Sequence, residues 1–227
     1  MATITISREY GSGGDEVAAR VSEVLGYHYF DKTLMAQLVK ETGLAEDEVV
    51  DFSEDNYKVR GLLDKLFAPR GGRELYNVSQ GSGVTQGARI RETAIQNESQ
   101  GITLVQGVIW AAYKQGNMVI VGRGGQAILK GLPGVLHVRI LAPPESRFEH
   151  ITATENLHHF GLRKEIVEHD EAAADYLKRF YNIDWADPML YDLVINTEHL
   201  SVEAATDIIV AAVKYLPVPE PVRKVAV

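Results

Sequence analysis

The chain contains no cysteine among its 227 residues. Disulfide bonds, thiolate metal sites and a cysteine nucleophile are therefore excluded, and the absence fits a reducing compartment. The sequence also lacks an apolar run near the roughly 20 residues that a membrane-spanning helix needs. The first strand-like run begins at about Ala2, with no charged leader before it. We accordingly expect a cytoplasmic protein without a membrane partner.

Positive charge is scarce as well. Lysine and arginine total 23 against 31 aspartates and glutamates, which gives a formal net charge of −8. An acidic protein repels the phosphate backbone of nucleic acids, so we expect no nucleic-acid partner. A local basic pocket for a small phosphate ligand remains compatible with this balance. The sequence gives no indication of the oligomeric state.

A chain of this length can bury a sizeable hydrophobic core, and 45% of its residues are hydrophobic. One core is therefore enough to stabilise the whole chain. We predict a single domain over residues 1–216. The tail, 217–227, begins with alternating prolines and cannot continue a helix. Two polar stretches, at about 45–100 and 152–165, interrupt the strand and helix pattern. We interpret both as insertions between core elements.

The first thirty residues follow the order strand, glycine loop, helix, strand. Residues 3–6 form a β-branched run, a glycine-rich turn follows, residues 17–25 carry an apolar helical face, and residues 27–30 read as a second strand. Further apolar runs at 118–121, 135–141 and 192–196 alternate with helical patterns. Such runs are typical of a parallel sheet covered on both faces. The predicted fold is therefore α/β.

A glycine-rich turn between a first strand and a helix places backbone N–H groups at a helix N-terminus, where they bind phosphate. The candidate phosphate-binding residues are Gly11, Ser12, Gly13, Gly14, Asp15 and Glu16. A tight turn that needs only positive φ angles is the alternative interpretation. Location after the first strand of a parallel sheet favours the phosphate site.

The loop lacks the lysine of the P-loop pattern G-x-x-x-x-G-K-[ST]. Aligned with a nucleotide-kinase loop, Gly14 stands at the lysine and Glu16 at the hydroxyl residue that holds Mg²⁺. Arg8, at the edge of the loop, is a candidate replacement for the missing charge, and the alternative is a surface pair with Glu9 or Asp15. Glu16 is either a Mg²⁺ ligand or an ordinary first-turn carboxylate.

Five segments together resemble the cytidylate kinase-like family, which is related to the cytidylate kinases. They are residues 4–14 (ITISREYGSGG), 30–32 (FDK), 119–124 (VIVGRG), 142–147 (APPESR) and 185–197 (WADPMLYDLVINT). The resemblance implies a three-layer α/β/α fold of the P-loop NTPase type, with a helical insert like the monophosphate-binding segment and a short lid. It also implies transfer of phosphate from ATP, with Mg²⁺, to a nucleotide acceptor.

The resemblance assigns roles to three further residues. Asp31 matches the aspartate that opens the monophosphate-binding segment, and Arg123 matches an arginine that contacts the monophosphate. Arg147 matches the first arginine of the helix that leads into the lid. The catalytic candidates are thus Arg8, Arg123 and Arg147, and the acceptor-binding candidates are Asp31 and Arg123.

Other positions depart from the cytidylate kinase pattern. Gln37 and Ala173 stand where arginines are expected, and Gly124 replaces an aspartate. Three functions therefore remain open: a kinase for a nucleoside monophosphate or similar small acceptor, a nucleotide-binding protein without turnover, and a kinase with a non-nucleotide acceptor. Fold alone does not separate them. No protein metal site is expected beyond Mg²⁺ near Glu16.

Overall fold

The computed structural model describes residues 2–30, 102–155 and 161–217. Within these ranges a five-stranded parallel sheet has the strand order β2-β3-β1-β4-β5. The strands are β1 (Thr3–Arg8), β2 (His28–Phe30), β3 (Met118–Val121), β4 (Val135–Leu141) and β5 (Leu193–Asn196). The predicted α/β fold with a parallel sheet is confirmed.

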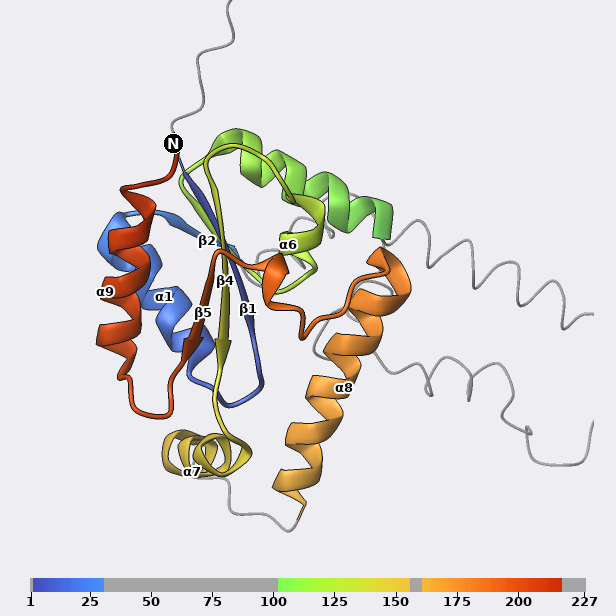
Figure 1. Cartoon of the computed structure of the whole chain (residues 1–227), viewed down its shortest axis with the longest axis vertical. Helices are drawn as coiled ribbons and strands as arrows, with labels where there is room; N and C mark the ends of the chain where they lie inside the picture. Colours follow the sequence, from blue (N-terminus) through green and yellow to red (C-terminus); the bar gives the residue numbers. More distant parts are fainter. Residues whose placement is uncertain (1, 31–101, 156–160, 218–227) are drawn as a thin grey trace, which may run out of the picture.

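Helices cover both faces of the sheet, which makes three layers (Figure 1). On one face lie α1 (Gly14–Leu25) and α9 (Val202–Val213). On the other lie α6 (Gly125–Ile128), the helical residues 102–115 and α8 (Leu162–Tyr181). Helix α7 (Pro144–Glu155) lies beyond the ends of β4 and β5 in Figure 1, and a 3₁₀ turn, η1 (Pro188–Leu190), precedes β5.

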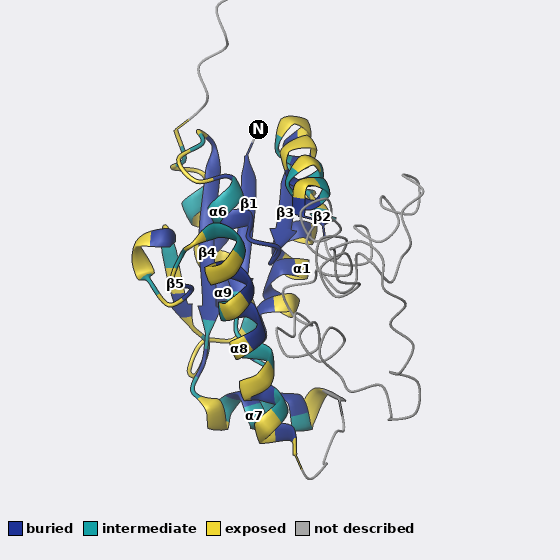
Figure 2. Cartoon of the chain, turned by 90° about the vertical axis from the view of Figure 1, so that its right-hand side faces the viewer, coloured by how far each residue is buried: buried dark blue, intermediate teal, exposed yellow. Residues whose placement is uncertain are grey.

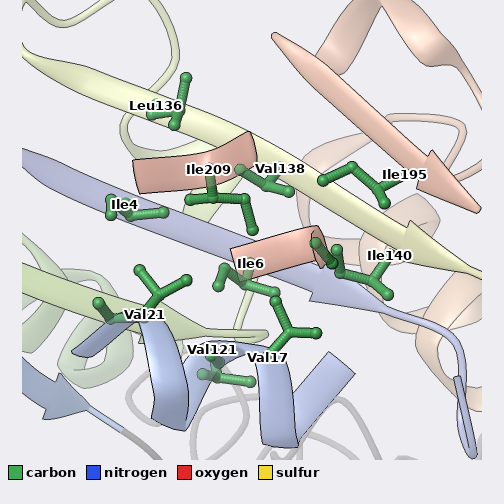
Figure 3. Close-up of a cluster of buried hydrophobic side chains, with 13 residues drawn as sticks. Ile4, Ile6, Val17, Val21, Val121, Leu136, Val138, Ile140, Ile195 and Ile209 are labelled. Carbon is green, nitrogen blue, oxygen red and sulfur yellow. The ribbon is translucent and has the colours of Figure 1, made fainter. Parts of the chain in front are cut away.

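The largest buried cluster lies between the sheet and the α1/α9 pair (Figure 3). Side chains alternate between the two faces of a strand, so Ile4 and Ile6 of β1 point toward this cluster, where Val17 of α1 and Ile209 of α9 meet them. All four side chains are at most 1% exposed. The central strands β1, β3 and β4 are buried, while the edge strands β2 and β5 and the outer faces of the helices carry exposed residues (Figure 2).

The opposite face of the sheet carries polar side chains that have internal partners. The Thr5 hydroxyl lies 2.7 Å from Nδ1 of His137, and burial lowers the pKa of that histidine below its ordinary value. Trp185 donates its indole N–H to Ser7 Oγ at 2.7 Å. Arg139 stacks on Trp185, with 4.3 Å between the guanidinium carbon and the ring centroid. Partnered polar groups of this kind offset much of the cost of their burial.

Three helix ends carry residue types that favour those positions. Gly26 caps α1 in the left-handed region, Ser201 accepts a hydrogen bond from the Ala204 N–H at 3.2 Å, and Pro144 is the first residue of α7. Of the polar range 152–165, which we interpret as an insertion and which corresponds to the short lid that the resemblance implies, residues 152–155 end α7 and 162–165 begin α8. Residues 156–160, the insert 45–100 and all but Pro217 of the tail lie outside the described residues.

No helix in the described ranges is long and apolar enough to cross a membrane.

Candidate active site

The carboxyl ends of the parallel strands meet at one edge of the sheet, the edge that faces α7 in Figure 1. There β1 runs into the glycine loop, residues 9–13, and β3 runs into residues 122–124. Likewise β4 is followed by Ala142 and β5 by Thr197. Ligands of open parallel sheets bind at this edge.

The glycine loop has a backbone that requires glycine at two positions. Gly11 and Gly13 have φ angles of 79° and 74°, in the left-handed region that side chains disfavour. A Cβ at Gly11 would also lie 2.6 Å from Cδ1 of Ile151. Helix α1 begins directly after the loop, at Gly14. The N–H groups of a first helical turn have no acceptor within the helix, so they are available to an anion.

A pocket of about 380 Å³ opens against this loop. It is bounded by the N-cap residues of α1 and α9, whose N-terminal dipole ends favour negative charge, and by one side of the first half of α7. Its lining residues are Gly11, Ser12, Gly13, Ala142, Ser146, Glu149, His150, Thr197, Glu198, Leu200, Ser201 and Val202. The convergence of helix N-termini makes this pocket a candidate site for an anionic ligand.

Ser12 has the one loop side chain in this lining. The residue is 4% exposed, and its hydroxyl has no hydrogen-bond partner within the described part of the chain. A buried hydroxyl without a partner costs about 1–3 kcal/mol. A phosphate oxygen or a water molecule in the pocket would remove that cost.

Thr197 fixes the loop from the side of β5. Its hydroxyl lies 2.7 Å from the carbonyl oxygen of Ser12 and 3.2 Å from that of Leu141. Sequence reasoning did not select Thr197 as a site residue. Its position directly after the last strand, at the ligand edge of the sheet, was the available signal.

Arg147 fixes the loop from the opposite side. Its side chain is 7% exposed. Its guanidinium donates to the Tyr10 carbonyl oxygen at 3.1 Å and to Asp170 Oδ2 at 2.6 Å. The other Asp170 oxygen accepts the Tyr10 N–H at 3.2 Å, and the Tyr10 ring stacks on His169 with 4.3 Å between centroids. This geometry ties α7 and α8 to the loop.

A second carboxylate supports the same network. Glu9 accepts from Arg139 at 3.2 Å and from the Ala142 N–H at 3.2 Å, and one of its oxygens lies 3.8 Å from Nε of Arg147. The positive charge of Arg147 therefore faces two internal carboxylates, Glu9 and Asp170, in this structure. Its predicted catalytic role stays a prediction, and sequence reasoning did not select the two carboxylates.

The remaining predicted loop residues make one ion pair and one contact with a histidine. Arg8 Nε donates to Asp15 Oδ1 at 3.0 Å, so the pair that sequence reasoning held as an alternative is present. Glu16 Oε1 lies 3.0 Å from Nε2 of His150 on α7. Among the described residues, no three His, Cys, Asp or Glu side chains form a group that could hold a metal ion. A phosphate role for Arg8 and a Mg²⁺ role for Glu16 stay predictions.

Arg123 follows β3 with an unusual backbone. It has φ of 61° between Gly122 and Gly124, which also have positive φ, and it is 6% exposed. Non-glycine residues rarely adopt this conformation, and such strain concentrates at functional sites. Asp31, the second predicted acceptor residue, lies outside the described residues.

A parallel sheet with a glycine loop between its first strand and first helix is the architecture of the P-loop kinases. The sequence model of the cytidylate kinase-like family matches residues 3–199. The chain therefore belongs to the cytidylate kinase-like family, as its sequence segments indicated.

Curated relatives agree with this membership. The chain is 26% identical over 212 residues to the cytidylate kinase of Archaeoglobus fulgidus, and this alignment covers 93% of the chain and 94% of the relative. It is 36% identical over 105 residues to the cytidylate kinase of Methanocaldococcus jannaschii, which covers 45% of this chain and 59% of that protein. The crystal structure of an uncharacterized protein from Eubacterium ventriosum superposes with a TM-score of 0.58 at 19% identity, over 95% of this chain and 99% of that one. This last likeness concerns the fold alone.

Proposed function

We propose that this protein transfers a phosphoryl group from ATP to a nucleoside monophosphate or a similar small acceptor. The observation that carries the proposal is the pocket at the glycine loop, where the N-termini of α1 and α9 meet beside Ser12, whose buried hydroxyl has no partner in the described part of the chain. Family membership supports a nucleotide-kinase-like phosphotransferase. The nucleotide acceptor is inferred from relatives named cytidylate kinase.

The donor nucleotide would bind with its phosphates on the loop. The first-turn N–H groups of α1 and the Ser12 hydroxyl would donate to phosphate oxygens. The rest of the nucleotide would lie in the pocket, between the first half of α7 and residues 198–202. Its volume, about 380 Å³, lies in the range of roughly 300–1,000 Å³ that is typical of small-ligand sites.

The acceptor would bind beside the donor, at the end of β3. Strand β3 pairs with β1 in register up to Ile6 and Val121, so Arg123 lies two residues beyond the pair, as Arg8 does on β1. A guanidinium group binds a phosphate bidentately, which would orient a monophosphate acceptor. Phosphoryl transfer needs positioning and charge stabilisation more than covalent catalysis by the protein. Arg123, together with Asp31, would position the acceptor.

Mg²⁺ accompanies ATP in kinases of this class and supplies neutralisation of phosphate charge. The chain offers it a hard oxygen ligand at the loop, the Glu16 carboxylate, which is 47% exposed in the first turn of α1. Glu16 would exchange its contact with His150 for that role.

The test is acceptor-dependent formation of ADP. Purified protein is incubated with Mg-ATP alone, with each nucleoside monophosphate, and with a set of phosphorylatable non-nucleotide acceptors. The informative variant is Arg123→Asn, because asparagine tolerates the left-handed conformation. Its matched control is Arg20→Asn, which removes an exposed arginine of α1 that pairs with Glu23.

We expect ADP only with a nucleotide acceptor, and an acceptor KM that rises in Arg123→Asn while the ATP KM and the Arg20→Asn control stay near wild type. ATP that raises the melting temperature without any turnover would instead identify a nucleotide-binding protein. Turnover with a non-nucleotide acceptor alone would identify a different substrate class.

A further inference from the structure

Compared with the P-loop pattern, the glycine and the cationic residue have exchanged places at positions 8 and 14 of this chain. In G-x-x-x-x-G-K the first glycine precedes the lysine by six positions. With Gly13 and Gly14 placed at the final Gly-Lys pair, Arg8 occupies the position of the first glycine. The chain therefore has an arginine where the pattern has its first glycine, and a glycine where the pattern has its lysine.

The structure gives a steric reason for this exchange. A Cβ built on Gly14 would lie 2.4 Å from Cβ and 2.8 Å from Cγ of Arg8. Gly14 is not among the residues with positive φ, so its backbone would accept a side chain. The stem of Arg8 thus occupies the space into which a side chain at position 14 would grow. A cation can be placed here from position 8 or from position 14, but not from both.

The guanidinium of Arg8 reaches the same end of α1 that binds phosphate in this fold. From the end of β1 its side chain passes Gly14, and Nε donates to Asp15 in the first turn of α1 at 3.0 Å. Further along the same loop, the Ser12 hydroxyl is buried without a hydrogen-bond partner in the described part of the chain, and Ser12 lines the pocket whereas Arg8 and Asp15 do not. These are independent signs of an anion site.

We propose that Arg8 is the phosphate-binding cation of this site and takes the place of the P-loop lysine, and that Asp15 holds its guanidinium when phosphate is absent. The proposal rests on the proposed function for the identity of the ligand, a nucleoside triphosphate. Asp15 is 59% exposed in its side chain while Arg8 is 14% exposed. The carboxylate therefore competes with phosphate for Arg8, and it also repels phosphate.

This competition separates a ligand-binding arginine from a merely structural one. If Arg8 binds phosphate, Asp15→Asn raises the affinity for ATP by a larger factor in the wild-type background than in the Arg8→Ala background, because only the wild type loses a competitor for Arg8 as well as a repulsive charge. We expect a gain of about twofold to fivefold, the size of an exposed ion pair. If the pair only stabilises the fold, Asp15→Asn lowers the melting temperature and changes ATP affinity by the same factor in both backgrounds.

The binding experiment is calorimetric titration of the full chain with three probes: Mg-ATP, adenosine and inorganic tripolyphosphate. Arg8→Ala is expected to weaken ATP and tripolyphosphate by about tenfold to a hundredfold, the size of a lost charge-assisted hydrogen bond. Adenosine binding should stay at the wild-type level. The control Arg20→Ala removes one positive charge from α1 without touching the loop, and should leave all three probes unchanged.

A relocated cation tests the shared space directly. The double variant Arg8→Gly with Gly14→Lys restores the first glycine and the lysine of the P-loop pattern, and we expect it to bind ATP at least about tenfold more tightly than Arg8→Gly alone. As a binding-independent readout, Gly14→Ala should lower the melting temperature in the wild-type background and not in the Arg8→Gly background. These variants keep the proposal testable if Arg8→Ala does not fold.

Each outcome decides a separate question. Wild-type binding of tripolyphosphate without turnover of any acceptor would overturn the proposed function and leave the Arg8 assignment in place. Turnover in wild type, with Arg8→Ala binding ATP equally well, would overturn the Arg8 assignment alone. Failure of wild type to bind ATP and tripolyphosphate would overturn both.

Discussion

Replacing Arg147 by methionine distinguishes an arginine that supports the glycine loop from one that acts on the ligand. Methionine retains apolar volume along the stem and removes the guanidinium that contacts Tyr10, Asp170 and Glu9. Loss of one partner from a buried ion pair costs about 3–5 kcal/mol. The two carboxylate side chains are 21% and 19% exposed, so water recovers part of that cost. We expect the free energy of unfolding to fall by about 2–4 kcal/mol.

The measurement is urea unfolding at pH 7, with the slope of the transition checked against wild type. Arg163→Met is the matched control, because Arg163 also joins α8 to α7 through an ion pair with Glu145, but both side chains are more than half exposed. That control should unfold much as wild type does. If Arg147→Met unfolds like wild type while acceptor-dependent turnover collapses, our reasoning about the network is refuted and the catalytic role predicted from the sequence is supported.

Three further predictions concern substitutions of single residues. Burial lowers the pKa of His137 below its ordinary 6.5. As the pH falls below about 6.5, the unfolded chain therefore binds a proton at this histidine more readily than the folded chain does, and the free energy of unfolding decreases. His137→Gln should reduce the shift of the urea midpoint between pH 7.5 and 5.5, and an unchanged shift would contradict this. Ser12→Ala should raise the free energy of unfolding by up to about 1–3 kcal/mol, because it removes a buried hydroxyl without a partner in the described part of the chain, and it should weaken ATP binding about threefold to tenfold. Unchanged ATP affinity in titration calorimetry would remove Ser12 from the site. Gly124→Ala should destabilise by about 1–3 kcal/mol in urea unfolding, because its Cβ would lie 2.6 Å from Tyr181 in a backbone with φ of 71°, and a wild-type midpoint would contradict that clash.

The sheet and its helices were predictable because local signals agreed with the tertiary structure. The runs at 118–121 and 135–141 are β3 and β4. Gly26 ends α1 and Ser201 begins α9, and both residue types favour those helix ends. These features depend on side-chain period and on backbone conformation, which a sequence displays directly. Membership of the family followed from segments in order, without any contact being known.

The network around the loop was not predictable from those signals. Asp170 contacts Tyr10 across 160 positions of sequence, and Thr197 contacts Ser12 across 185. Which carboxylate meets which arginine depends on the packing of α7 and α8 against the strand ends, and no periodicity encodes it. A resemblance matched Arg147 to a lid arginine by its position alone, and position does not reveal that two carboxylates face it.

The absence of the P-loop lysine can now be argued as a question of where positive charge is held. Arg139 and Arg147 are buried and face Glu9 and Asp170, so their charge balances carboxylates that fix the loop. Arg8 faces a mostly exposed carboxylate, Asp15, which water screens and which an entering phosphate can replace. A buried pair is expensive to break and an exposed pair is not. Of these described ion pairs, the Arg8–Asp15 pair is therefore the least costly to break, which agrees with the phosphate role proposed for Arg8.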